Sequence, residues 1–99
     1  KLDTNGDFLW AKSVGDGGHE IARDVAINTN GDIYISGITD GHTVDFDPGS
    51  GIANKAPMGL KDIFILKLNS SGNFIWVKTI GGIDNDYAHG LALDYNGNV

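Results

Sequence analysis

Short apolar runs alternate with polar, glycine-containing stretches along the whole chain. Four runs rich in β-branched and aromatic residues stand between turn residues: DVAIN at 24–28, DIYISGIT at 32–39, DIFILKLN at 62–69 and NFIWVKTI at 73–80. No stretch with helical spacing is long enough to compete with them. Short turns containing glycine join the runs in pairs, so the pattern predicts an all-β fold built on a four-stranded antiparallel meander.

The turns recur along the chain. Their glycines, Gly6, Gly31, Gly72 and Gly97, are 25, 41 and 25 residues apart, so one short and one long interval make a unit of 66 residues. Residues 1–33 laid on 67–99 without a gap give 11 identities in 33 pairs. Internal repetition of this kind is typical of solenoids and propellers. The chain therefore holds about one and a half repeats.

The first turn, in LDTNGDFLW, resembles the start of a calcium loop, because Asp3, Asn5 and Asp7 fall at alternate positions. An EF-hand loop also needs glycine at its sixth position and glutamate at its twelfth, and here these are Phe8 and Val14. Only the turn glycine is the same in all four related stretches. We therefore interpret them as hairpin turns whose glycine takes a positive φ.

Both faces of the third run are apolar, which separates the possible all-β folds. Alternate positions on one face carry Ile63 and Ile65, and those on the other carry Phe64, Leu66 and Leu68. A sheet with one solvated face would show polar residues at one of these sets. Four-stranded sheets stacked radially fit the pattern, and this is the β-propeller architecture. A β-sandwich is the alternative, although its edge strands would not need two apolar faces.

Several linked motifs carry a family resemblance. GDIYISG, TVDFDPGSG and DIFILKLNSSGNFIWVKTIGG, with an acidic residue before each first strand, resemble the bacterial β-propeller repeats called SBBP. The resemblance implies blade-sized units that close into a ring, in long extracellular or cell-surface chains. It implies no shared catalytic residues.

The repeat phase predicts three segments. Residues 1–23 are the end of a preceding blade with its connecting loop, 24–80 are one complete blade, and 81–99 begin the next. The chain is thus expected to be a piece of a longer protein. Alone, it would expose apolar sheet faces and open edges, and we expect it to oligomerise, aggregate or pair with neighbouring blades of the same or another chain.

Composition narrows the choice of partners. The net charge of −6 argues against nucleic acid and anionic membranes as partners, because both repel an acidic surface. No apolar run approaches the roughly 18 residues of a membrane span. The chain has no cysteine, which excludes disulfides and thiolate metal sites within it.

Candidate chemistry gathers in the long connections, residues 14–23, 40–61 and 80–89, which the meander places at the end of the sheet opposite the short turns. All three histidines and seven of the 13 acidic residues fall there. Asp45 and Asp47, in TVDFDPG, share one side of an extended segment and are candidate calcium ligands. Asp-Pro-Gly is also an ordinary turn opener, so a structural role is the alternative.

A second acidic pair, Asp84 and Asp86, has the same alternate spacing. These residues are candidate calcium ligands as well. In the other copy Glu20 takes the place of Asp86, whereas Gly18 takes the place of Asp84. An acid that recurs before each first strand favours a structural role, in which it accepts hydrogen bonds from backbone amides between blades.

No motif for catalysis stands out, and no cofactor other than calcium is predicted. The sequence contains no G-x-S-x-G elbow, and the HE of His19 and Glu20 is not followed by a second histidine at the spacing of a zinc protease. We therefore expect a non-catalytic binding or structural scaffold of an extracellular or cell-surface propeller. The alternatives are part of an enzyme with its site in the central channel, and a surface filament or adhesin subunit that assembles through sheet edges.

Overall fold

The computed structural model describes residues 1–15, 20–40, 43–55, 61–82, 84 and 86–99. Within these ranges all regular secondary structure is β-strand, so the expected all-β class is confirmed. Among the same residues, no helix is long and apolar enough to cross a membrane.

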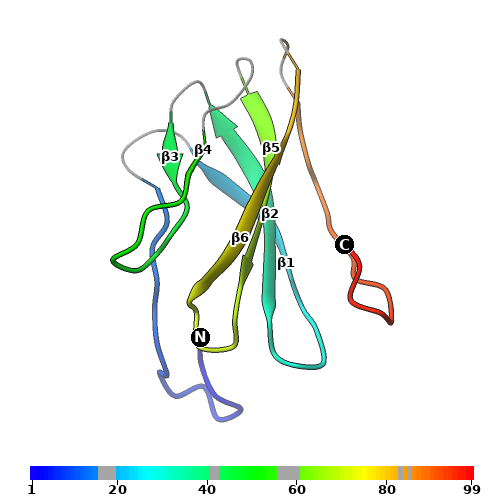
Figure 1. The fold of residues 1–99 in the computed structure, drawn as a ribbon. Helices are drawn as coiled ribbons and strands as arrows, with labels where there is room; N and C mark the ends of the chain where they lie inside the picture. Colours follow the sequence, from blue (N-terminus) through cyan, green and yellow to red (C-terminus); the bar gives the residue numbers. More distant parts are fainter. Residues whose placement is uncertain (16–19, 41–42, 56–60, 83, 85) are drawn as a thin grey trace.

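One antiparallel sheet of four strands dominates the structure (Figure 1). Its strands are β1 (Ile21–Ile27), β2 (Ile33–Asp40), β5 (Lys61–Leu68) and β6 (Phe74–Ile80), and they lie in the order β1-β2-β5-β6. The short turns after β1 and β5 lie at one end of this sheet, which we call the turn end. The long connections lie at the other, as the meander predicts (Figure 1).

Two details of the strands differ from the expectation. β1 begins at Ile21, three residues earlier than predicted, and its pairing with β2 is irregular between Ala22 and Asp24. The long connection between β2 and β5 contains a small antiparallel pair, β3 (Val44–Asp45) and β4 (Asn54–Lys55). The pair forms because Val44 is completely buried and anchors this connection to the sheet.

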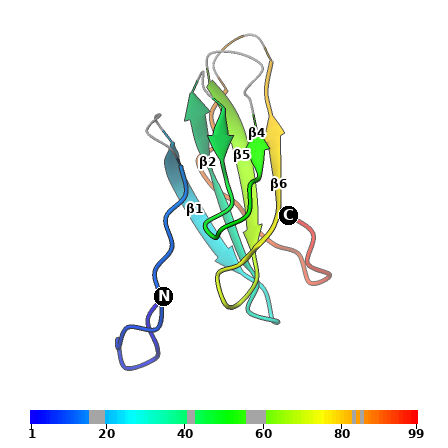
Figure 2. The same ribbon diagram turned by 60° about the vertical axis from the view of Figure 1, so that its left-hand side comes forward.

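The first face of the sheet, which we call the core face, carries the main hydrophobic core. Cross-strand register places Ile33, Leu68, Leu66 and Val77 on this face together with Phe64. The connection that contains β3 and β4 packs over it, and the Phe46 ring lies 4.9 Å from the Phe64 ring. Figure 2 shows this connection in front of β5 and β6. Burial of these side chains supplies the main stabilisation of the sheet.

The opposite face is covered less completely. Tyr34, Ser36 and Ile38 of β2 are buried there, whereas Ile63 and Ile65 of β5 are only half-buried. Residues 86–91 run along this face: the Asp86 amide donates to the Lys61 carbonyl at 2.8 Å, and the Lys61 ammonium lies over the Tyr87 ring. The two apolar faces predicted for β5 therefore exist, and one of them is only partly covered.

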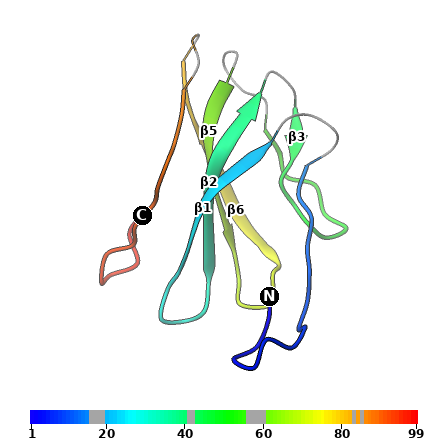
Figure 3. The same cartoon turned by 180° about the vertical axis from the view of Figure 1, so that it is seen from behind.

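The terminal segments lie on opposite sides of the sheet (Figure 3). Trp10 and Val14 pack against the core, whereas Leu91 contacts β1 from the other side. The repeat phase predicts that residues 7–14 continue as a strand, but the structure pairs only Leu2 with Phe8 in the N-terminal segment. A strand is held by hydrogen bonds to a neighbouring strand, and among the described residues no strand of the sheet pairs with residues 9–14.

Candidate functional site

The same hydrogen-bonded turn occurs four times, which explains the calcium-like spacing at the start of the chain. In the first copy, Asp3 Oδ1 accepts hydrogen bonds from the Asn5 and Asp7 amides at 2.8 and 2.9 Å. The equivalent acceptors are Asn28, Asn69 and Asp94, each bound to the amides two and four residues later. All four turn glycines have a φ of 82 to 85°. The prediction of hairpin turns is confirmed.

The carboxylate in the last copy is stabilised in its charged form. The Asn98 side chain donates to Asp94 Oδ2 at 2.7 Å, and the Asn98 amide donates to Oδ1. These hydrogen bonds hold the pKa of Asp94 below its usual value, with the side-chain bond from Asn98 as the largest cause. The side-chain Oδ1 of the first residue in each turn thus accepts hydrogen bonds from backbone amides. Asp and Asn both supply this oxygen, so either residue can occupy the first position of the turn.

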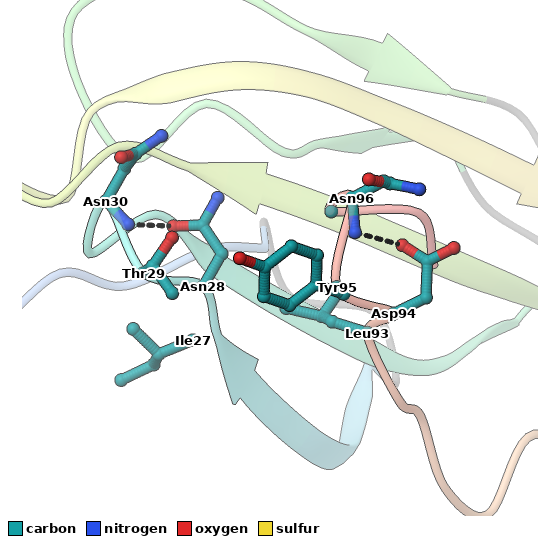
Figure 4. Close-up of a pocket in the computed structure, with 9 residues that line it drawn as sticks. Ile27, Asn28, Thr29, Asn30, Leu93, Asp94, Tyr95 and Asn96 are labelled. Atoms are coloured by element: carbon teal, nitrogen blue, oxygen red, sulfur yellow. Dashed lines mark hydrogen bonds between the residues drawn. The ribbon is translucent and has the colours of Figure 1, made fainter.

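A polar cleft of about 250 Å³ separates two of these turns (Figure 4). It lies between residues 27–30, at the end of β1, and residues 93–97, which are the equivalent turn one unit later. The Tyr95 side chain stands at this cleft and is fully exposed. Sequence reasoning placed candidate chemistry only at the long connections and missed this cleft. The repetition of the turn could have predicted this cleft, because equivalent turns of successive units lie close together when the units pack side by side.

The first predicted calcium pair, Asp45 and Asp47, accepts hydrogen bonds from backbone amides of its own connection. Asp45 Oδ1 accepts hydrogen bonds from the Asp47 amide at 3.0 Å and the Ala53 amide at 2.8 Å. Asp47 Oδ1 accepts from the Gly49 amide at 2.7 Å. The pKa of Asp45 is lowered, chiefly by the amide of Ala53. The expected alternation is also present, because the neighbouring Val44 and Phe46 are fully buried.

The second predicted pair is only partly described. Asp84 is exposed, and residues 83 and 85 lie outside the described residues. Asp86 Oδ2 accepts a hydrogen bond from the Gly82 amide at 3.0 Å. Across the described residues, no three metal-binding side chains come together. Calcium binding by Asp45, Asp47, Asp84 and Asp86 stays a prediction, and His19 and His42 of the long connections lie outside the described part of the chain.

The described hydrogen bond of one recurring acid before the first strands, Asp86, stays within its own connection instead of reaching across units. Asp86 bonds to Gly82 in its own connection, and in the described structure Glu20 Oε1 is buried without a hydrogen-bond partner. The inter-unit role belongs to Asp24 instead. Its Oδ1 accepts from the Val25 amide at 2.9 Å, and its Oδ2 accepts from the Leu91 amide at 2.8 Å.

Val25 and Leu91 are equivalent residues of successive units, exactly one repeat of 66 residues apart. Asp24 therefore binds the equivalent amide in two successive units, one in β1 and one in the C-terminal segment. Sequence reasoning missed this residue because its equivalent in the second unit is Gly90. A residue that has its role in only one unit cannot be recognised by comparing the two units.

An apolar groove lies along β1 on the core face. Two depressions of about 350 and 220 Å³ adjoin at Ala22 and Ile35, and we call them together the β1 groove. The rest of the lining comes from Lys12, Val14, Glu20, Arg23, Asp24, Val25, Phe46, Phe64 and Leu66. On the same strand face, Val25 is 59% exposed and Ile27 is 62% exposed. Exposed apolar side chains gathered in this way are typical of an interaction surface.

The comparisons with known proteins agree with a propeller-type repeat. The chain is 27% identical to an uncharacterised WD repeat-containing protein of Acanthamoeba polyphaga mimivirus, over 111 aligned positions. The alignment covers 99% of this chain and 8% of that protein. WD repeats are propeller repeats with four-stranded blades. No protein-family model matches the chain, and no solved structure matches it.

Proposed function

We propose that the chain is a non-catalytic segment of a β-propeller scaffold whose partners are proteins. The observation that carries the proposal is the hydrogen bond from the Leu91 amide to Asp24 Oδ2, which holds the C-terminal segment, the start of the second unit, against the sheet of the first. Successive units that lean on one another in this way build a repeat architecture, in which each unit depends on its neighbours for burial.

Two further observations support the proposal. The relative with WD repeats aligns along almost the whole chain. The surface also leaves large apolar side chains exposed on several elements, among them Val25, Ile27 and Ile80, as expected of a unit that packs against others. The acidic composition, with a net charge of −6, favours protein partners over nucleic acid.

Self-association of the chain tests whether it is a segment that needs neighbours. We expect sedimentation velocity to show assemblies whose size increases with protein concentration. We expect Ile27→Lys to reduce them, because it places a charge among the exposed apolar side chains of β1. Asp7→Lys is the matched control, because Asp7 is exposed in the N-terminal turn. A folded monomer at every concentration would contradict the proposal, whereas regular filaments would favour a filament subunit instead.

The same proposal places the parent protein outside the cell or on its surface, as in the bacterial repeats that the sequence resembles. The connection around Ile52 supplies a convenient epitope, because that side chain is 76% exposed. An antibody against residues 48–53 should label intact cells that carry the protein. Labelling that requires permeabilised cells would contradict this location and leave the scaffold role in place.

A further inference from the structure

We propose that the cleft between the turn of residues 27–30 and the turn of residues 93–97 binds a neutral saccharide. The site goes beyond the proposed scaffold role, since it assigns a small ligand to a surface that the packing of units does not need. The cleft measures about 250 Å³. Sites for drug-sized molecules measure roughly 300 to 1,000 Å³, so this cleft suits a ligand of about one sugar ring.

Both walls of the cleft are fixed by hydrogen bonds within the turns. In one wall, Asn28 Oδ1 accepts hydrogen bonds from the amides of Asn30 and Asp32 at 3.0 and 2.9 Å. In the other, Asp94 Oδ1 accepts a hydrogen bond from the Asn96 amide at 2.9 Å (Figure 4). A site whose backbone is already ordered loses less conformational entropy when it binds a ligand.

The other polar side chains at the cleft are available to a ligand. Within the described structure, no hydrogen bond engages the side chains of Thr29, Asn30, Tyr95 or Asn96. Two carboxamides and two hydroxyl groups supply donors and acceptors without carrying a charge. Sugar hydroxyl groups also donate and accept hydrogen bonds, so a neutral sugar complements these side chains.

Tyr95 is the residue that points most directly to a ligand. The equivalent tip positions of the other three turns are Thr4, Thr29 and Ser70. All four tip positions are exposed, so exposure is a property of the turn, and packing within the repeat does not require an aromatic ring there. An exposed tyrosine offers a flat apolar face next to a hydroxyl group. The apolar face of a sugar ring can stack on such a ring.

The charge of the cleft disfavours other small ligands. Among the described residues that line it, there is no Lys, Arg or His to hold a phosphate or a carboxylate. Asp94 lines the cleft, and its lowered pKa keeps it negatively charged, so it repels anions. Both Asp94 oxygens already accept hydrogen bonds from Asn98, and a metal ion would have to compete with these bonds. A neutral, hydroxyl-rich molecule meets neither obstacle.

Saturation-transfer NMR on the 99-residue chain tests the site, with cellotetraose, chitotetraose, maltotetraose and mannotetraose as the probes. We expect saturation to reach the sugar-ring protons of at least one of these saccharides. Tyr95→Ala should raise its dissociation constant at least about fivefold, because the stacking surface is lost. Asn30→Ala, in the other turn, should raise it about threefold through the loss of a hydrogen bond. Both side chains are exposed, so neither substitution disturbs the packing of the sheet.

Matched controls lie away from the cleft. Tyr87→Ala removes an exposed tyrosine beside Lys61, and Asn5→Ala changes the equivalent of Asn30 in the N-terminal turn. Both should leave the dissociation constant unchanged. Absence of saturation transfer to all of the saccharides would overturn the inference, and so would a loss of binding in Tyr95→Ala alone, because a cleft needs both turns. Neither result bears on self-association of the chain, which tests the proposed function separately.

Discussion

The Asp24 carboxylate joins two successive repeat units through a single side chain. One oxygen binds the Val25 amide and the other binds the Leu91 amide, at 2.9 and 2.8 Å. The two amides are equivalent positions in their units, so the side chain holds the C-terminal segment at a defined position against β1. Gly90 occupies the Asp24 position of the second unit and has no side chain that could accept such a bond.

Removal of this carboxylate should loosen the C-terminal segment. We expect Asp24→Ala to lower the free energy of unfolding by about 1 to 2 kcal/mol, because two charge-assisted hydrogen bonds are lost, of which the one from Leu91 is partly buried. Exchange of the Leu91 amide should speed up at the same time. Urea unfolding and hydrogen exchange measure the two effects. Asp7→Ala, at an exposed acid, is the control, and an unchanged Leu91 amide would refute the role of Asp24.

Trp10 should make one turn glycine more sensitive than another. Gly31 and Gly72 have φ values of +84 and +82°, so alanine at either is strained by about 1 kcal/mol. A Cβ at Gly72 would also lie 2.8 Å from Trp10 Cη2, whereas at Gly31 its nearest neighbour is the exposed Ser70 at 3.1 Å. We expect Gly72→Ala to cost about 1 to 2 kcal/mol more than Gly31→Ala in thermal or urea unfolding.

A double mutant separates the two contributions at Gly72. With Trp10→Ala present, Gly72→Ala should cost no more than Gly31→Ala, because only the backbone strain remains. If Gly72→Ala and Gly31→Ala are equally costly in the original chain, Trp10 does not pack tightly on this turn.

Acid should destabilise the fold through Asp45 and Asp94, whose pKa values are lowered by hydrogen bonds to the charged carboxylates. A lowered pKa in the folded state means that the stabilisation is present above the unfolded value of about 3.8 and is lost as the pH falls through the folded value. We expect Asp45→Asn to flatten the acid limb of the stability curve, because asparagine keeps one acceptor and does not titrate. An acid limb of unchanged slope would contradict this assignment.

Calcium gives the clearest test of the predicted metal ligands. Asp45, Asp47 and Asp86 already accept hydrogen bonds from backbone amides, and a cation would have to compete with those amides. We therefore expect calcium at millimolar concentrations to leave Tm unchanged. A saturable rise in Tm that is lost in Asp45→Asn would assign Asp45 to a calcium site, whereas loss in Asp84→Asn would place the site at the second pair.

Much of the fold could be predicted from the sequence, because hydrophobic patterning and turn chemistry act over short distances. The runs of β-branched and aromatic residues that became β2, β5 and β6 identify the strands directly. The positive φ at Gly31 and Gly72 follows from the lack of a Cβ in glycine. The 66-residue repeat adds the order of the strands, since it relates each turn to its copy.

The candidate site could be predicted only in part. Asp45 and Asp47 could be singled out because they lie in a recognisable turn sequence. In the structure their carboxylates accept hydrogen bonds from nearby backbone amides. The β1 groove and the role of Asp24 were missed, because they arise from residues that the chain brings together across a whole unit. The expectation that Glu20 binds a backbone amide between units stays a prediction, because residues 16–19 before it lie outside the described residues.

The sequence by itself determined an all-β chain, the hairpin turns, the pairing of neighbouring strands and the phase of the repeat. All of these depend on contacts between residues close in sequence or on the alternation of side chains along a strand. Only the tertiary structure decided which face carries the core, how residues 86–91 run along the other face, and that Asp24 links the units. Such contacts depend on how elements approach one another in space, and identical local patterns are compatible with more than one approach.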